Sequence, residues 1–557
     1  MRWNRYRGFL LLALALSALV QVAYLRSHEF PALLGGLFLE MAATVADSGT
    51  LPTTIGGFTT EGVPFAYPPL GFYIMAVFLK LGVDGVALLR FGSPVVLLGI
   101  VAFIYHLTWV LTDRPATALI AGIITGTHVT LNVYLVGASG FIRGLGFLFM
   151  LVAMFGAYQY YANDGGRRAL ATATVGWGLV VLTHPVHAAA AGAGVAMAWL
   201  VWDRTPRGLA TGAGIALGGL AVASPWWLTV VSNHGADIFF AGAGSQGSFN
   251  SSLSDLGELV EWFWDGGYVL NWPAAFAVVG AASLVARGEW QKPVWLAAPI
   301  VLLVPPHGRL GILVVAPLGA VGFMLALSLL TELDIDLPDR STERLSRLPR
   351  PSRSGLPTLP SSFDPPELST RQVVAVVFFL VLVGPFVGQN MAAASGTSPH
   401  SPLPVYADAD DRTAMAWIES ETAADTQVAV VGGASEWFPH LANRTSVIVK
   451  YGKEWSGQET FSRHESAQYE LRNCWNASCV NATLVDREFA AETDYVYVPY
   501  GGFMSGRGGA TISPALHESL VASEQFTRVY RNDGVGVYAY NRTAVAGSGA
   551  QSGSGVA

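Results

Sequence analysis

The sequence predicts a mainly α-helical, polytopic membrane domain of about 11 spans, followed by a small extracytoplasmic α/β domain at the C-terminus. Three observations support this prediction. The 557 residues are 52% hydrophobic and only 13% charged, whereas a soluble domain carries about 25% charged residues. Apolar stretches of membrane-spanning character recur between short loops that contain arginine or lysine. The segment after the last of these stretches is polar and contains turn and strand patterns.

Eleven stretches are candidates for membrane spans, because they match or approach the length of about 20 apolar residues that a bilayer requires. Positive charge in the short loops marks the cytoplasmic side. The resulting orientation has a cytoplasmic N-terminus and an extracytoplasmic C-terminus. The candidate spans are residues 8–25, 86–111, 116–136, 141–161, 169–183, 188–202, 208–231, 267–286, 293–304, 310–330 and 373–389.

Changes in composition along the chain indicate its domain boundaries. The basic N-terminus precedes a long apolar run without a small-x-small cleavage site, which favours an uncleaved anchor. The Pro-, Ser- and Arg-rich region before the last span cannot bury a core, so disorder is expected there. The predicted parts are a membrane domain at 1–330 with an external loop at 27–85, a cytoplasmic linker at 331–370, the last transmembrane helix at 371–390, an extracytoplasmic α/β domain at 400–543 and a disordered tail at 544–557.

Local patterns in the last domain predict helices and strands. Residues 411–421 form an amphipathic pattern, and the apolar runs 428–431 and 495–498 are typical of buried strands. Asn532-Asp533-Gly534 lies between two strand patterns, a combination that favours a β-hairpin. These patterns together predict a small α/β domain.

The modification sites that the sequence suggests all lie in this domain. The two cysteines are five residues apart in a polar segment without a neighbouring His or Cys cluster, which favours a local disulfide over a structural metal site. Four glycosylation sequons in one polar domain agree with an external location. The residues are Cys474 and Cys479 for the disulfide, and Asn443, Asn476, Asn481 and Asn541 for glycosylation.

The long loop after the first span carries the candidate catalytic acids. Glu40 lies in the apolar helical pattern 35–46, where a carboxylate would have a raised pKa suited to a general base; the alternative is an exposed glutamate on a surface helix. Asp47 and Glu29 are further candidates, and turn or cap roles are their alternatives. We expect residues 69–82, which are too few to span the membrane, to form a helix docked at the outer face.

Aromatic and cationic residues at the predicted external ends of the spans are the candidate substrate-binding residues. Ionisable groups at such positions are costly and tend to mark function. Arg143, in a glycine-rich segment, either binds a phosphate as a forked donor or extends to the membrane surface from a helix start. His184 and His187 contact a ligand or pack structurally. The candidates are Tyr67, Arg90, Arg143, His184, His187, His234, His307 and Arg309, of which the last two form either a phosphate clamp or an ordinary turn.

Several of these features together resemble the GT-C superfamily of membrane glycosyltransferases, which includes the protein O-mannosyltransferases and the aminoarabinose and oligosaccharyl transferases. The features are the acid-bearing first external loop, Tyr67-Pro68-Pro69-Leu70, Arg143 after glycines, Leu182-Thr183-His184-Pro185 and the external C-terminal domain. The resemblance implies an enzyme that takes a sugar from a polyprenyl-phosphate carrier at the outer face. It also implies a first-loop acid as catalytic base and basic residues that hold the carrier phosphate.

The first loop departs from this family at one position. The family usually has an acid near the start of the first-loop helix, where this chain has Leu34-Gly35-Gly36-Leu37. Either Glu40 or Glu29 replaces that acid, or the chain has lost transfer activity and is a GT-C-like lipid-binding or transporter-like membrane protein.

The partners that follow from the resemblance are a polyprenyl-phosphate sugar lipid, a glycan or protein acceptor, and membrane lipid. The chain has no basic block of the kind that binds nucleic acid. The sequence assigns no cofactor and leaves the use of a divalent cation open.

Overall fold

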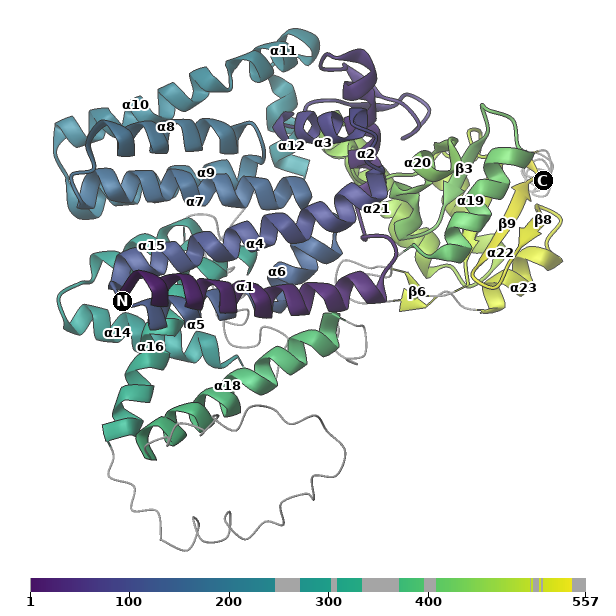
Figure 1. Cartoon of the computed structure of the whole chain (residues 1–557). Coiled ribbons are helices and arrows are strands. Elements are labelled where there is room, and N and C mark those ends of the chain that lie inside the picture. Colours follow the sequence, from purple (N-terminus) through teal and green to yellow (C-terminus); the bar gives the residue numbers. More distant parts are fainter. Residues whose placement is uncertain are drawn as a thin grey trace, which may run out of the picture.

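The computed structural model describes residues 2–245, 271–301, 308–332, 370–394, 407–500, 502–503, 510–511 and 514–542. Figure 1 shows a bundle of long helices, with the C-terminal α/β domain at one end of the bundle. The short helices α2 and α3 lie at the same end, next to that domain. The loop after the first helix and the C-terminal domain are therefore neighbours in space, although they are far apart in the sequence.

The bundle contains the helices that the hydropathy pattern predicts. By length and composition, six helices in the described part could cross a membrane, or up to eight if each of two bent pairs is one span. The bundle helices are α1 (Arg2–Ser27), α4 (Gly85–Thr112), α5 (Pro115–Thr127), α6 (Val129–Leu131), η1 (Asn132–Gly137), α7 (Phe141–Ala162), α8 (Gly166–Val181), α9 (Pro185–Trp202), α10 (Pro206–Val222), α11 (Ser224–His234), α12 (Asp237–Ser245), α14 (Trp272–Ala286), α15 (Gln291–Val301), η2 (Gly308–Gly311), α16 (Ile312–Glu332) and α18 (Thr370–Ala394).

Each of the eleven predicted spans coincides with one of these helices or with a bent pair. Three of them, α8, α14 and α15, have 16, 15 and 11 residues in the described part, which is short for a crossing. Two of the predicted spans are bent pairs of helices. Residues 116–136 bend by 50° and residues 208–231 by 62°, because His128 is extended between α5 and α6 and the chain restarts as a new helix around Pro225.

The first external loop contains four short elements: α2 (Gly35–Ser48), β1 (Thr54–Ile55), β2 (Val63–Pro64) and α3 (Leu70–Lys80). β1 and β2 pair in the antiparallel direction, with Thr54 opposite Pro64. The short helix predicted within residues 69–82 is confirmed as α3, and its location at the outer face stays a prediction. Because Leu37, Leu39 and Met41 are buried, α2 belongs to the main hydrophobic core.

The C-terminal domain is confirmed as an α/β fold around a five-stranded sheet of order β4-β3-β5-β9-β8. β3 pairs in parallel with β4 and β5, and the predicted hairpin is the antiparallel pair β8–β9. The elements are α19 (Ala409–Glu421), β3 (Gln427–Val430), η3 (Gly433–Glu436), α20 (Phe438–Ala442), β4 (Thr445–Ser446), η4 (Lys453–Ser456), α21 (Gln458–Asn473), α22 (Ala477–Asp486), β5 (Tyr495–Pro499), β6 (Gly502–Phe503), β7 (Ala510–Thr511), α23 (Pro514–Ala522), β8 (Phe526–Arg531) and β9 (Val535–Tyr540).

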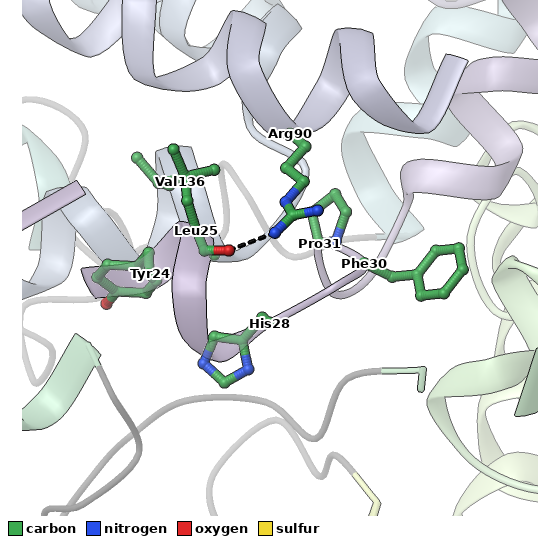
Figure 2. Close-up of a pocket in the computed structure, with 8 residues that line it drawn as sticks. Tyr24, Leu25, His28, Phe30, Pro31, Arg90 and Val136 are labelled. Carbon is green, nitrogen blue, oxygen red and sulfur yellow. Dashed lines mark hydrogen bonds between the residues drawn. The ribbon is translucent and has the colours of Figure 1, made fainter. Parts of the chain in front are cut away.

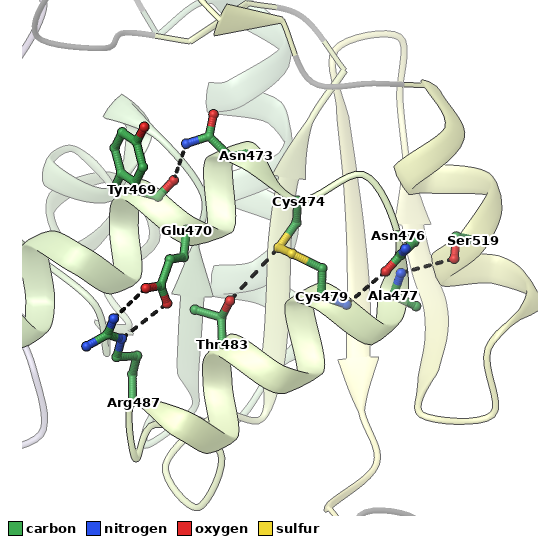
Figure 3. The surroundings of a disulfide bond; sticks show 10 residues. All are labelled: Tyr469, Glu470, Asn473, Cys474, Asn476, Ala477, Cys479, Thr483, Arg487 and Ser519. Atoms are coloured by element: carbon green, nitrogen blue, oxygen red, sulfur yellow. Dashed lines mark hydrogen bonds and ion pairs between the residues drawn. A yellow bond between two sulfur atoms is a disulfide. The ribbon is translucent and has the colours of Figure 1, made fainter.

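The disulfide and the sequons lie on this domain. Cys474 and Cys479 are bonded to each other and connect the end of α21 to the first turn of α22 (Figure 3). Asn443 and Asn541 are exposed, whereas the side chain of Asn476 caps α22 and that of Asn481 accepts a hydrogen bond from the Tyr540 hydroxyl. Glycosylation of the four asparagines stays a prediction. The predicted linker, apart from its first two residues and Thr370, and the predicted tail lie outside the described residues.

Candidate functional site

The first loop and the C-terminal domain form one continuous structure. The Thr59 amide donates to the Ser446 carbonyl (2.8 Å), and the Ser446 amide donates to the Gly57 carbonyl (2.9 Å). Phe58 thereby pairs in parallel with Ser446 at the edge of the sheet, next to β4. The hydroxyl of Thr60 also donates to a Glu492 carboxylate oxygen (2.5 Å). The loop therefore covers a sheet edge that would otherwise be open.

Trp437 anchors the C-terminal domain against the start of α2. Its indole Nε1 donates to the Pro31 carbonyl (2.9 Å), and its ring contacts Phe30 edge to face, with 5.5 Å between centroids. Gly35 lies against the indole, and Gly36 lies against the backbone of Glu436 and Trp437. A Cβ at either glycine would overlap these atoms. This contact gives a physical reason for glycine at both positions.

Two of the three acids predicted in the first loop have partners on the C-terminal domain. Glu40 contacts His440 Nδ1 at 2.6 Å, and both side chains are partly exposed. Glu29 forms an ion pair with Arg412 at 2.7 Å. Asp47 is exposed near the end of α2. Two of the three candidate bases thus lie in the contact between loop and domain, a use that the sequence pattern did not predict.

Arg143 lies in the first turn of α7, at the junction with the C-terminal domain. Its Nη1 donates to the Tyr134 carbonyl (2.7 Å), and its guanidinium is 5.9 Å from the Tyr134 ring centroid. Burial and the negative charge of Glu436 raise the pKa of Tyr451, whereas the charge of Arg143 lowers it. These electrostatic effects place Arg143, Tyr451 and Glu436 in one neighbourhood, built from both parts of the chain.

Glu436 is the most unusual acid of this neighbourhood. It is 6% exposed, and its Oε2 is buried without a hydrogen-bond partner among the described residues. Burial raises the pKa of its carboxyl to about 8; Lys450 acts in the opposite direction, and Glu454 raises the pKa further. Sequence reasoning missed this residue, because Glu436 ends the short 3-10 helix η3, and no sequence pattern there marks an acid as buried.

A second group of candidates gathers beside this junction. The rings of His184 and His187 are 4.3 Å apart, and Tyr67 lies 6.3 Å from His184 and 6.4 Å from Trp455 of the C-terminal domain. Gly146 of α7 packs directly against His184. The structure therefore brings three of the candidate residues, Tyr67, His184 and His187, together in an aromatic cluster.

Arg90 lies in a separate small hollow between the end of α1 and the end of η1. Figure 2 shows its guanidinium donating to the Leu25 carbonyl, with His28 on the opposite side of the hollow. His234 ends α11, and no hydrogen bond or ion pair of the described residues joins it to Arg143. His307 lies outside the described residues, and only the backbone of Arg309 is described, in η2.

The described residues contain no group of three or more His, Cys, Asp or Glu side chains arranged to hold a metal ion. The candidate site consists of the cation Arg143, the buried acid Glu436, and the aromatic cluster. Tyr134 and Tyr451 lie near Arg143. Arg143, with its planar donors, suits a phosphate group. The acid suits proton transfer, since a carboxyl that titrates near neutral pH can accept or release a proton under physiological conditions.

No protein-family model and no curated protein matches this sequence. The chain is similar in structure to the archaeal oligosaccharyltransferase AglB from Archaeoglobus fulgidus, solved with an inhibitory peptide and a dolichol-phosphate. The TM-score is 0.54 and the identity 13%, over 89% of this chain and 69% of AglB.

The chain is also similar to ArnT from Cupriavidus metallidurans. The TM-score is 0.52 to the undecaprenyl-phosphate complex and 0.53 to the apo state, with 14% identity over 96% of this chain and 98% of ArnT in each case. At this identity the similarity concerns the fold, which extends over both the helical bundle and the C-terminal domain. The fold implied by the resemblance to the GT-C superfamily is confirmed.

Proposed function

On the basis of this shared fold, we propose that the chain is a multi-pass membrane glycosyltransferase that takes a sugar from a polyprenyl-phosphate carrier at the extracytoplasmic face. The observation that carries the proposal is the convergence of three parts of the chain on one neighbourhood. Arg143 at the start of α7 and Glu436 of the C-terminal domain both act on Tyr451, and Gly36 of the first loop packs against Glu436. Both similar proteins were solved with a polyprenyl phosphate bound. In this chain, Arg143 is a forked donor at the start of α7, near Tyr451 of the C-terminal domain.

In the proposed reaction, an acceptor hydroxyl of a glycan or protein attacks the anomeric carbon of the carrier-linked sugar. The bond from that carbon to the phosphate oxygen breaks, and the electron pair leaves on the polyprenyl phosphate. Arg143 stabilises the negative charge that grows on the departing phosphate. Attack opposite to the leaving group inverts the configuration at the anomeric carbon.

The aromatic cluster supports the same proposal. Tyr67, His184 and Trp455 come from the first loop, the bundle and the C-terminal domain, respectively. Aromatic faces with polar edges suit the apolar faces and hydroxyl edges of a sugar. A position beside Arg143 would place a carrier-linked sugar between phosphate donor groups and aromatic faces.

The experiment is the glycan profile of a deletion strain, measured by mass spectrometry of glycolipids and glycopeptides after complementation. The wild-type chain should restore at least one glycan that the deletion removes, and Arg143→Ala should reduce that glycan by about 100-fold or more at equal protein level. Arg168→Ala is the matched control, because Arg168 is an exposed arginine at the start of α8. An unchanged profile in the deletion strain would remove the transferase proposal and favour the lipid-binding or transporter-like alternative.

A further inference from the structure

A buried carboxyl of the C-terminal domain lies where the two parts of the chain meet. Glu436 is the last residue of η3, and its own backbone carbonyl packs against Gly36 of α2. Its side chain is nearly excluded from solvent, and its Oε2 has no hydrogen-bond partner in the described part of the chain. Leaving such an oxygen buried and unpaired is energetically unfavourable. The fold therefore keeps this acid at an energetic cost, which is typical of functional sites.

The groups around Glu436 distinguish it from the other acids nearby. Lys450 forms its own ion pair with Glu465, and a carboxylate oxygen of Glu454 accepts a hydrogen bond from the Gly452 amide (2.6 Å). Charge effects connect Glu436 to Tyr451, and Tyr451 to Arg143. The acid is therefore in electrostatic contact with Lys450 and Tyr451 of its own domain, and through Tyr451 it approaches the cation of the bundle.

We propose that Glu436 is the catalytic base that accepts the proton of the acceptor hydroxyl, so that the C-terminal domain supplies the base and the bundle supplies the phosphate-binding cation. The proposal rests on the transferase function proposed above and names the group that carries its proton transfer. The proton moves from the acceptor oxygen to the Glu436 carboxylate, while that oxygen forms its bond to the anomeric carbon. Glu436 ends neutral, and the carrier phosphate leaves with one additional negative charge.

The packing at the start of α2 leaves no room for an acid at the position where the resemblance implies one. An acid at position 36 would place its Cβ inside the backbone of Glu436 and Trp437. Glu40, one turn further along α2, is occupied by His440 at 2.6 Å. The same packing that excludes a side chain at Gly36 brings Glu436 to the start of α2. The acid at the start of α2 is therefore Glu436 of the C-terminal domain, and the loop itself carries glycine there.

The test uses the full-length protein and four variants, with Glu436→Gln as the decisive one. Because the buried carboxyl has a pKa of about 8 and is mostly protonated near pH 7, glutamine has nearly its shape and charge and should keep the fold. We expect Glu436→Gln to lower transfer by about 100-fold or more, with the same elution profile and melting temperature in detergent. Glu436→Asp should recover part of the activity. Undecaprenyl phosphate, used as the probe, should still bind to Glu436→Gln but not to Arg143→Ala.

The matched control is Asp411→Asn. Asp411 is a second buried acid of the same domain, and burial raises its pKa to about 6. Its carboxylate accepts a hydrogen bond from the Tyr497 hydroxyl. This variant should retain full transfer activity. In the wild type, activity should rise as the pH increases through about 8, because only the ionised carboxylate accepts a proton. Glu436→Gln should lose this rise.

The outcomes separate the two proposals. If the wild type restores no glycan, the transferase function itself fails. If the wild type restores the glycan and Glu436→Gln restores it equally with the same pH profile, the acid is structural and the assignment of the base is wrong. If Glu436→Gln misfolds, Glu436→Asp decides: a folded Asp variant with unchanged activity and pH profile also overturns the assignment.

Discussion

Two contacts between parts of this molecule are built in opposite ways. Within the bundle, α14 and α16 approach so closely that a Cβ on Gly280 would overlap the Leu318 carbonyl, and one on Gly322 would overlap the Phe276 carbonyl. Between the first loop and the C-terminal domain, the contact combines Trp437 with the charged pairs Glu29–Arg412 and Glu40–His440. The first contact is a close approach of backbones, whereas the second is an aromatic anchor surrounded by ion pairs.

The difference follows from the surroundings of each contact. Lipid provides no hydrophobic driving force between helices, so close packing of small residues has to hold them together. The loop and the domain meet where charged side chains remain partly exposed, so ion pairs there are weakened by salt and depend on pH. We therefore expect the bundle to respond to added volume, and the loop–domain contact to respond to lost side chains, pH and salt.

The largest effect should come from added volume at the α14–α16 contact. Gly322→Leu places a side chain against the Phe276 backbone, which cannot move away as a flexible side chain could. We expect loss of the folded protein, measured as the monodisperse fraction in detergent. Gly384→Leu on α18 is the control, because nothing lies within 4 Å of a Cβ at that position. Equal yields of both variants would show that the contact does not depend on close backbone approach.

The next effect should come from removing the aromatic anchor. Trp437→Ala deletes a buried side chain and its hydrogen bond to Pro31, at a cost of about 3–5 kcal/mol. The loop–domain contact should open, which hydrogen exchange in α2 and at residues 57–59 would detect, while the bundle stays folded. Trp475→Ala is the control, because Trp475 is 67% exposed. Unchanged exchange in α2 would mean that other contacts hold the two parts together.

The elements of the fold could be predicted from the sequence where a local pattern decides them. The hairpin at Asn532-Asp533-Gly534 depends on turn residues and alternation, so β8 and β9 appear as expected. The bend in residues 116–136 could not be predicted, because it involves a π-helical turn and an extended His128 within an apolar run. Apolar character alone does not distinguish a bent pair from a straight span.

Only the residues that the helical bundle contributes to the candidate site could be predicted from the sequence. Arg143 and His184 stand out in a sequence because ionisable residues are rare in apolar runs. Glu436 and His440 belong to a polar domain in which acids and histidines are ordinary, and their importance arises from a contact with α2 about 400 positions away. Such a contact has no local pattern. The two glycines at 35 and 36 were a visible departure, but only the packing of Trp437 against them explains it.

A smaller effect should appear in the pH dependence of stability. Because the pKa of Glu436 is about 8 in the folded protein and 4.5 in the unfolded one, the folded state binds the extra proton between these values. The resulting stability is fully present below pH 4.5 and is lost as the pH rises through about 8. Between about pH 5.5 and 7.5, this group should lower the stability by about 2–3 kcal/mol.

Glu436→Gln should remove this slope, because glutamine does not titrate. The measurement is chemical denaturation of the detergent-solubilised protein, followed by tryptophan fluorescence, at a series of pH values. Asp411→Asn is a useful comparison, because the lower folded pKa of Asp411, about 6, moves its own contribution to lower pH. A wild type and a Glu436→Gln variant with the same slope would show that Glu436 titrates normally and is hydrated in solution.

The smallest effect should come from the exposed pair Glu29–Arg412. Its side chains are 40% and 55% exposed, so Glu29→Gln should cost at most about 1 kcal/mol at low salt. The difference in melting temperature between this variant and the wild type should vanish at about 1 M salt, where the screening length is about 3 Å. Glu40→Gln, which affects a more buried pair, should keep more of its effect at high salt. If the effect of Glu29→Gln persists undiminished at high salt, the pair acts through packing, because a screened charge pair could not produce it. The loop–domain contact would then be held mainly by close packing, as the helices of the bundle are.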